Sequence, residues 1–310
     1  MLYDVLIIGG GPAALTAAIY SRRAGKSVLI IERMVPGGQV ALTSTVENYP
    51  GIKKIDGVTL ATNMFDHASS LGAEFVFSDV LEFNLKDKVK SVRTHEGTFE
   101  GKTIILCLGA SAKQLNLENE KKFVGRGVSY CATCDGALYK DGTVAIVGGG
   151  NTSLEDSLYL AGLAKKVYLI HRRDQFKGDQ ILVNQLNAEV AKPSSPIEVL
   201  LNSHVIKIDG QDKIETITVE NCASKETKTL KVDALFIAIG RKPDTELLDG
   251  VELDKNGYII TNEKMETNIP GVYAAGDVRQ KQLRQIVTAC SDGAIASINT
   301  NEYILKNFGS

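Results

Sequence analysis

The stretch Val5-Leu6-Ile7-Ile8-Gly9-Gly10-Gly11-Pro12-Ala13-Ala14 decides the fold of this chain. Its four apolar residues have the length of a buried parallel strand, and they end in glycine. Residues 13–24 are rich in alanine and leucine, which is typical of a helix, and Gly25 follows. Residues 27–31 form a second apolar run before Glu32. The stretch therefore begins a strand–helix–strand unit with parallel strands.

The glycines of this stretch match the G-x-G-x-x-G/A dinucleotide fingerprint at Gly9, Gly11 and Ala14. Gly9 allows a tight turn, and Gly11 allows a pyrophosphate to approach backbone N–H groups at the start of the helix, where Pro12 lies. Glu32 would accept hydrogen bonds from a ribose 2′-hydroxyl and repel a 2′-phosphate. The pattern indicates FAD or NAD; the alternative is a purely structural turn.

The same unit recurs 139 residues later. Residues 143–147 form an apolar strand, and Gly148, Gly150 and Ser153 occupy the three fingerprint positions. Gly148 precedes His171 by 23 residues, which is also the separation of Gly9 from Glu32. The repeat predicts two similar nucleotide-binding domains.

The two repeats differ in charge where the ribose is expected. The second has His171-Arg172-Arg173, followed by Lys177, where the first has a carboxylate. A cationic cluster at this position suits the 2′-phosphate of NADP. The alternative is an ordinary solvated run of surface charge.

Five cysteines are present, and only Cys131 and Cys134 form a close pair. A CxxC in a chain with this patterning indicates a redox dithiol that can close as a disulfide. Asp135 could manage the protons of the dithiol, or it could cap a following helix. Neither the other cysteines, interpreted as ordinary buried residues, nor the four histidines show ligand spacing, so we expect no metal site.

The composition is that of a globular protein of about two domains. The chain has 310 residues, with 35 Lys and Arg against 37 Asp and Glu, and this balance argues against nucleic-acid binding. The N-terminus lacks a secretory pattern and no apolar run could span a bilayer, so we expect a cytoplasmic protein that does not bind membranes.

Further elements follow from apolar runs. We expect strands at 103–106, 232–239 and 272–275, and a hairpin or strand connection at 96–102. The last helix is predicted to start near Gln285 and to run in pieces towards Leu305.

The chain resembles the low-molecular-weight, bacterial-type thioredoxin reductases, members of the FAD- and NAD(P)-dependent pyridine nucleotide-disulfide oxidoreductases, over essentially its full length. The resemblance is carried by residues 9–14, Gly37-Gly38-Gln39, Glu47-Asn48-Tyr49-Pro50-Gly51, Cys131-Ala132-Thr133-Cys134-Asp135-Gly136, residues 148–153, His171-Arg172-Arg173, Ala275-Gly276-Asp277 and Arg284-Gln285. The chain departs from the family in two places: Cys107-Leu108-Gly109 replaces Ala-Thr-Gly, and Lys177 replaces arginine.

The resemblance implies an α/β fold of two Rossmann-like, three-layer ββα domains. The FAD domain would be split over 1–113 and 245–310, and the NADPH domain, which carries the CxxC, would be inserted at 114–244. The family forms homodimers and is thought to rotate its NADPH domain.

The resemblance also implies the cofactor-binding residues. FAD would be held by Gly9, Gly11, Pro12, Ala14, Glu32, Gly38, Gln39, Asn48, Gly109, Gly276, Asp277, Arg284, Gln285 and Ile286. NADPH would be held by Gly148, Gly150, Asn151, Thr152, Ser153, His171, Arg172, Arg173, Lys177 and Gly240.

The expected activity is the reduction of thioredoxin. Hydride passes from NADPH to FAD, then to the Cys131–Cys134 disulfide, and the dithiol reduces thioredoxin by exchange, with Asp135 as the third catalytic residue. Alternatives are another acceptor (a glutaredoxin-like or peroxiredoxin-linked protein, or a small dithiol oxidised by oxygen), another electron donor such as ferredoxin, or a non-catalytic nucleotide sensor.

Overall fold

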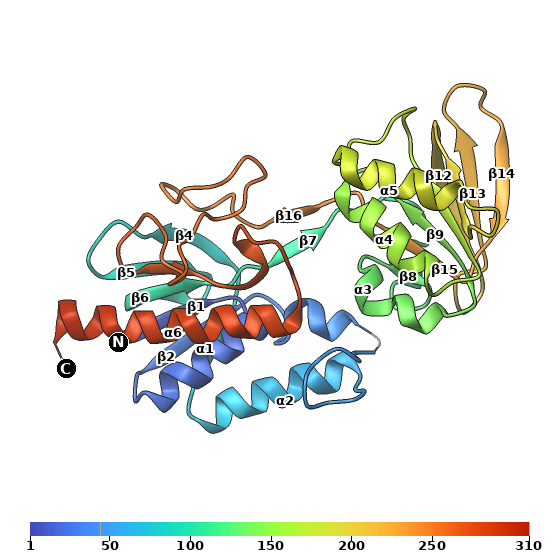
Figure 1. Ribbon diagram of the computed structural model, residues 1–310. Coiled ribbons are helices and arrows are strands. Elements are labelled where there is room, and N and C mark those ends of the chain that lie inside the picture. Colours follow the sequence, from blue (N-terminus) through green and yellow to red (C-terminus); the bar gives the residue numbers. More distant parts are fainter. Residues whose placement is uncertain (44, 310) are drawn as a thin grey trace. The chain divides into compact units, whose positions relative to one another are not determined.

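A computed structural model describes residues 1–43 and 45–309; Ser44 and Ser310, both within the range predicted for the FAD domain, lie outside the described residues. The chain divides into two compact units (Figure 1). The first unit consists of Met1–Ser111 and Lys242–Ser310, and the second of Ala112–Arg241. The main sheet of each unit has a parallel core, and the predicted α/β fold class is confirmed.

The first unit is built on a seven-stranded sheet in the order β3-β2-β1-β6-β5-β4, with β17 also paired to β6. The strand that precedes the first glycines, β1, lies at its centre between β2 and β6, and all three are parallel. The strands are β1 (Leu2–Ile8), β2 (Val28–Glu32), β3 (Glu74–Phe77), β4 (Val80–Asn84), β5 (Lys90–Thr94), β6 (Gly97–Leu106) and β17 (Val272–Ala274). The predicted connection at 96–102 is the antiparallel β5–β6 hairpin.

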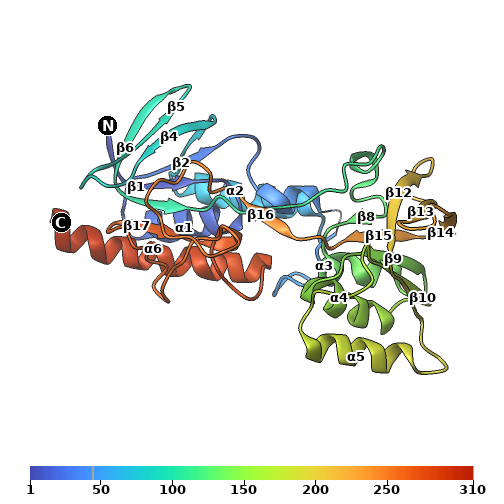
Figure 2. The same cartoon turned by 90° about the horizontal axis from the view of Figure 1, so that it is seen from above.

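Three helices pack side by side in the first unit, as Figures 1 and 2 show: α1 (Pro12–Arg23), α2 (Gly57–Ser70) and α6 (Ile286–Phe308). The long helix starts next to Gln285, as predicted, but it is one continuous helix, so the expectation that it runs in pieces was wrong. Gly293 lies in its middle, and a Cβ there would fall 2.1 Å from the carbonyl oxygen of Ala13. Close packing against α1 therefore offsets the usual cost of a helical glycine.

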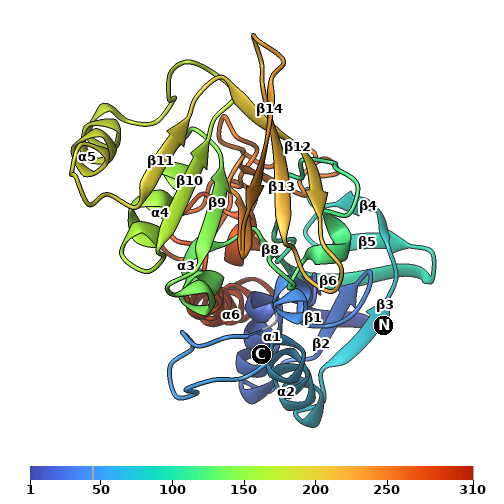
Figure 3. The ribbon, with the colours of Figure 1, turned by 90° about the vertical axis from the view of Figure 1, so that its right-hand side faces the viewer.

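The second unit has a parallel sheet in the order β11-β10-β9-β15-β8. Figure 3 shows an antiparallel sheet, β12-β13-β14, on one side of it and α4 and α5 on the other. The bounds are β8 (Val128–Ser129), α3 (Ala132–Asp135), β9 (Thr143–Val147), α4 (Asn151–Ala161), β10 (Lys166–Ile170), α5 (Gln180–Val190), β11 (Ile197–Leu200), β12 (Ser203–Asp209), β13 (Thr216–Asn221), β14 (Thr227–Lys231) and β15 (Ala234–Ile237).

Two apolar cores hold these layers together. One lies between the parallel sheet and β12-β13-β14, and the other between the parallel sheet and its helices. The unit therefore has the three ββα layers that were predicted. The chain passes between the two units through β7 (Ala110–Ala112) and β16 (Arg241–Pro243), which pair with each other.

Short 3₁₀ turns complete the fold: η1 (Gly38–Leu42), η2 (Lys121–Phe123), η3 (Gly136–Tyr139) and η4 (Gly276–Val278). Among residues 1–43 and 45–309, no helix combines the length and the apolar character needed to cross a bilayer.

Candidate functional site

The first glycine turn leaves open space at the start of α1. Gly9 has φ +103°, and a Cβ on it would lie 2.4 Å from the carbonyl oxygen of Cys107, so only glycine fits there. A Cβ on Gly11 would meet no described atom within 4 Å. The backbone of Gly10 donates to Oε2 of Glu32 at 2.5 Å, which fixes that carboxylate beside the turn. Open space, helix N–H groups and a fixed carboxylate fit the phosphate and ribose of a dinucleotide.

Two distant segments are brought to this turn. The backbone of Gly37 donates to the carbonyl oxygen of Gly10 at 2.7 Å, and a Cβ on Gly38 would lie 3.4 Å from Cα of Gly11. A Cβ on Gly276 would lie 2.9 Å from Cβ of Ala13, close to the turn. The structure thus gathers predicted FAD-binding residues from three parts of the sequence.

A second group of predicted FAD-binding residues surrounds the start of α6. Nδ2 of Asn48 donates to Oε1 of Gln285 at 3.0 Å, and Nε of Arg284 donates to the carbonyl oxygen of Asp277 at 3.2 Å. The guanidinium of Arg284 also stacks on a tyrosine ring. Ile286 packs in a small apolar cluster, whereas Gln39 is exposed and Gly109 adopts φ +68° in open space.

Sequence reasoning missed Asp292, a buried acid on α6. Its Oδ2 accepts from the backbone of Gly276 at 3.0 Å, from Nε of Arg279 at 2.8 Å and from Nζ of Lys281 at 2.6 Å. These bonds fix the turn that carries Asp277. A carboxylate on the inner face of a predicted helix was the only available signal.

The second glycine turn also leaves open space at the start of its helix, α4, although Gly148 lacks the positive φ of Gly9. A Cβ on Gly148 would lie 2.5 Å from the carbonyl oxygen of Ala238, whereas one on Gly150 would meet no described atom within 4 Å. Ser153 is buried, and its hydroxyl donates to the carbonyl oxygen of Gly150 at 2.8 Å. Serine at the third fingerprint position is therefore tolerated because its hydroxyl is satisfied.

The segment 171–177, called the basic loop below because it carries Arg172, Arg173 and Lys177, folds back onto this turn. The backbone of Lys177 donates to the carbonyl oxygen of Gly149 at 2.6 Å. Asn151, the first residue of α4, exchanges two 2.7 Å hydrogen bonds with Asp179. Thr152 is exposed on the first turn of the same helix, and Gly240 has φ +105° after β15.

The cationic residues of the loop are not equivalent. His171 is buried, and its ring stacks on Phe176 and would overlap a Cβ on Gly149. Burial lowers the pKa of His171, which favours the neutral ring. Arg172, Arg173 and Lys177 are exposed, so these three supply the positive charge.

The redox pair is closed as a Cys131–Cys134 disulfide at the start of α3. The hydroxyl of Ser129 accepts from the backbone of Cys131 at 3.1 Å and donates to Oδ2 of Asp135 at 2.6 Å. Among the described residues, Oδ1 of Asp135 is buried and has no hydrogen-bond partner. Burial raises the pKa of Asp135, which favours the protonated form of this carboxyl in the residue directly after Cys134.

The alternative role of Asp135 as a helix cap was wrong. The helix starts at Ala132, and the Asp135 side chain makes no capping bond at η3. Two of the three other cysteines also differ from expectation: Cys107 is buried, but Cys222 and Cys290 are half-buried.

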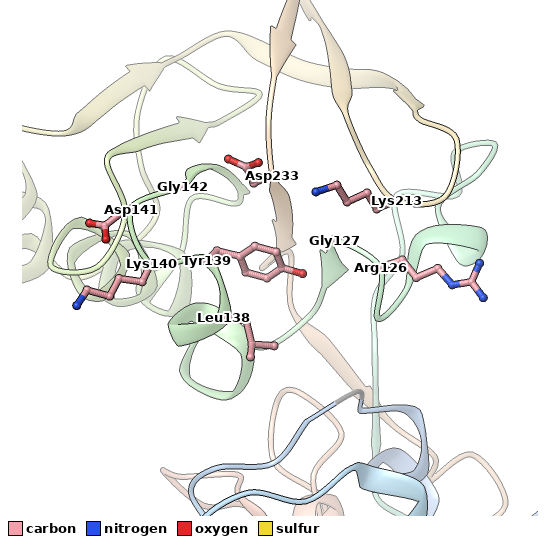
Figure 4. Close-up of a pocket in the computed structure, with 9 residues that line it drawn as sticks. All are labelled: Arg126, Gly127, Leu138, Tyr139, Lys140, Asp141, Gly142, Lys213 and Asp233. Atoms are coloured by element: carbon pink, nitrogen blue, oxygen red, sulfur yellow. The ribbon is translucent and has the colours of Figure 1, made fainter.

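The second unit also contains a pocket of about 500 Å³ (Figure 4). Tyr139 reaches into it, and burial together with the negative charges of Asp135 and Asp233 raises the pKa of this phenol. The lining combines cations and acids: Arg126, Gly127, Leu138, Tyr139, Lys140, Asp141, Gly142, Lys213 and Asp233. Such a lining suits polar or charged groups of a partner.

Comparison with known proteins gives a consistent result. A family model described as pyridine nucleotide-disulphide oxidoreductase matches residues 3–293. The thioredoxin reductase of Bacillus subtilis (strain 168) is 40% identical over 305 residues, which cover 98% of this chain and 95% of that protein. The crystal structure of thioredoxin reductase from Streptococcus pyogenes MGAS5005 superposes with a TM-score of 0.92 at 39% identity, covering 98% and 99% of the two chains.

A more distant structure agrees. Thioredoxin reductase from Giardia duodenalis gives a TM-score of 0.90 at 32% identity, over 98% of this chain and 99% of that one. The chain belongs to the pyridine nucleotide-disulphide oxidoreductases and, within them, to the thioredoxin reductase family. It is an oxidoreductase, and this membership implies FAD and NADPH as its cofactors.

Proposed function

We propose that the chain reduces the disulfide of thioredoxin with electrons from NADPH. The observation that carries the proposal is the closed Cys131–Cys134 disulfide, followed directly by Asp135, whose carboxylate accepts a hydrogen bond from Ser129. Membership of the thioredoxin reductase family supports thioredoxin as the acceptor.

The two cofactors are assigned to different units. FAD binds the first unit, where the open space at Gly11 lies beside the fixed carboxylate of Glu32. NADPH binds the second unit, where the open space at Gly150 lies near the exposed Arg172, Arg173 and Lys177. The observed units support predicted domains at 1–113 with 245–310 and at 114–244. We assign the remaining predicted cofactor residues to the same two sites.

When bound, FAD accepts a hydride from NADPH and delivers two electrons to a disulfide. The residues of the chain manage the sulfur atoms and the protons. Opening of the Cys131–Cys134 bond yields two sulfur atoms that need protons, and we assign the supply of one proton to the carboxyl of Asp135, the residue after Cys134. The hydroxyl of Ser129 is hydrogen-bonded to both the carboxylate of Asp135 and the backbone N–H of Cys131. These two bonds fix the carboxylate relative to the backbone of the redox cysteine.

The reduced pair then acts on the partner by thiol–disulfide exchange. One cysteine attacks the partner disulfide, and the other resolves the mixed disulfide and closes the pair again. We assign the pocket lined by Tyr139 and three cations to groups of the docked partner, because the charge of Asp135 acts on Tyr139.

The test is an anaerobic assay of the purified, yellow protein with NADPH and thioredoxin. We expect NADPH to bleach the flavin and thioredoxin to be reduced catalytically. The Cys134→Ser variant should bleach but not reduce thioredoxin, and turnover by this variant would refute the dithiol route. Bleaching without thioredoxin reduction would indicate another acceptor, and equal kcat/KM for NADPH and NADH would refute the role of the basic loop.

We further propose a cytoplasmic homodimer. The exposed side of α6 carries an apolar stripe of Val287, Ile295, Ile298 and Leu305, which a second copy could cover. Sedimentation of wild-type protein and of the Ile298→Glu variant tests this proposal, and we expect the variant to sediment as a monomer.

A further inference from the structure

Cys222 belongs to a cluster of reactive side chains outside the redox disulfide. Its Sγ lies 3.4 Å from Nδ1 of His204, and Nε2 of His204 lies 3.8 Å from Oε1 of Glu220. A thiol, an imidazole and a carboxylate in this order form an activated nucleophile, because the imidazole can take the thiol proton and the carboxylate stabilises the imidazolium. Cys222 is half-buried and the side chain of His204 is 42% exposed, so small solutes can reach the cluster.

Two neighbouring groups oppose activation of this thiol. The carbonyl oxygen of Arg172 lies 3.5 Å from Sγ of Cys222 and accepts from the thiol, so the thiol proton is engaged in this contact. Nζ of Lys225 donates to Oε1 of Glu220 at 3.1 Å, so Glu220 divides its charge between Lys225 and His204. Attack by Sγ therefore requires that the thiol proton leave the contact with Arg172 and pass to His204.

The cluster is joined to the basic loop through the backbone. The N–H of Cys222 donates to the carbonyl oxygen of Asn202 at 2.6 Å. The N–H of Asn202 in turn donates to the carbonyl oxygen of Arg173 at 3.0 Å. With the contact from Sγ to Arg172, these bonds tie Cys222 to both arginines of the loop. A group attached to Sγ would break the contact to Arg172 and would displace the backbone that carries Arg172 and Arg173.

We propose that Cys222 is a modification site for an anionic, low-molecular-weight disulfide and that its modification weakens NADPH binding; the second part rests on the proposed function. The exposed Arg172 and Arg173 attract the carboxylates of such a disulfide. In the reaction, the proton of Cys222 passes to His204 and Sγ attacks one sulfur of the disulfide. A new S–S bond forms, the old one breaks, and the leaving thiolate takes the proton from His204. Cys222 is oxidised and the departing thiol is reduced.

The first test is chemical. The FAD-loaded enzyme, with Cys131 and Cys134 closed as the disulfide, is incubated with glutathione disulfide, and the adduct is located by peptide mass mapping. We expect the adduct at Cys222 in the wild type and in the Cys290→Ser variant, which removes the other half-buried thiol, and no adduct in Cys222→Ser. An adduct only at Cys290, or none, would overturn the proposal.

The role of His204 has its own readout. The His204→Gln variant should react about tenfold more slowly near pH 7, and the difference should shrink near pH 9.5, where hydroxide removes the thiol proton. An equal deficit at both pH values would indicate a structural role and contradict base activation.

The consequence for the cofactor is measured by calorimetry with NADP⁺, which needs no turnover. We expect modification to weaken NADP⁺ binding about tenfold in the wild type, the loss of roughly one charge-assisted hydrogen bond, and to leave Cys222→Ser unchanged. An adduct at Cys222 without a change in affinity would refute the regulatory part. If the untreated enzyme binds no NADP⁺, the proposed function fails instead, and the adduct mapping still decides the modification site.

Discussion

The hydrogen bond between Ser129 and Asp135 joins residues on either side of the redox disulfide in the sequence, and a single substitution can probe it. Asp135→Asn keeps the shape of the side chain and can still accept from Ser129, but it cannot hold and release a proton. We expect kcat for thioredoxin reduction to fall about 100-fold, the lower end of general acid–base contributions. Anaerobic flavin reduction by NADPH should not change. Asp66→Asn, which changes an exposed acid on α2 outside the sites described above, is the matched control.

Asp156 on α4 predicts a pH dependence of stability. Burial raises its pKa from 3.8 to about 6, repulsion from Glu155 adds to the effect, and the charge of Arg241 partly offsets it. Because the folded-state pKa is the higher one, the stabilising contribution is complete below pH 3.8 and is lost as the pH rises through about 6. Relative to Asp156→Asn, the wild type should lose unfolding free energy across this window in urea titrations. A constant difference between the two proteins would contradict this environment for Asp156.

At the residue scale, sequence spacing alone predicted which residues form the first glycine turn. Gly9, Gly11 and Glu32 follow from one strand–helix–strand unit, because each is fixed by its place at a strand end. Asp292 and Ser129 could not be found in this way. Their importance arises from contacts with residues that the fold brings to them, and neither belongs to a motif.

At the element scale, the contact between α1 and α6 depends on Gly293. A Cβ at this position would collide with the backbone of Ala13, which cannot move aside as a flexible side chain could. We expect Gly293→Ala to lower the unfolding free energy by about 1–3 kcal/mol and to speed FAD release, because Ala13 adjoins the first glycine turn. Ser291→Ala, exposed on the same helix, is the control, and equal behaviour of the two variants would contradict the close approach.

The buried strands and the helices after each glycine turn were predictable, since apolar runs and fingerprint glycines mark them. The sheet β12-β13-β14 was not, because strands such as β14 are largely exposed and polar. The continuity of α6 was also missed, since the packing that compensates Gly293 comes from α1, far away in the sequence.

At the scale of the whole molecule, the second unit has the contents of an independent domain. It carries apolar cores on both faces of its parallel sheet. We expect residues 112–241, expressed alone, to unfold cooperatively when followed by circular dichroism and to bind NADP⁺ in calorimetry. The double variant Arg172→Ala, Arg173→Ala should keep the fold and lose most of the affinity. A disordered fragment would show that this unit depends on the rest of the chain.

The insertion of one unit into the other also determines the order in which the two units can fold during translation. A nascent chain leaves the ribosome from its N-terminus, so β1, β2 and β6 emerge early, whereas β17 and α6, which pack on β6 and α1, are made last. All strands of the second unit emerge between these two events. The first unit is therefore begun first and completed last. Its sheet lacks β17 and α6 while the whole second unit is translated.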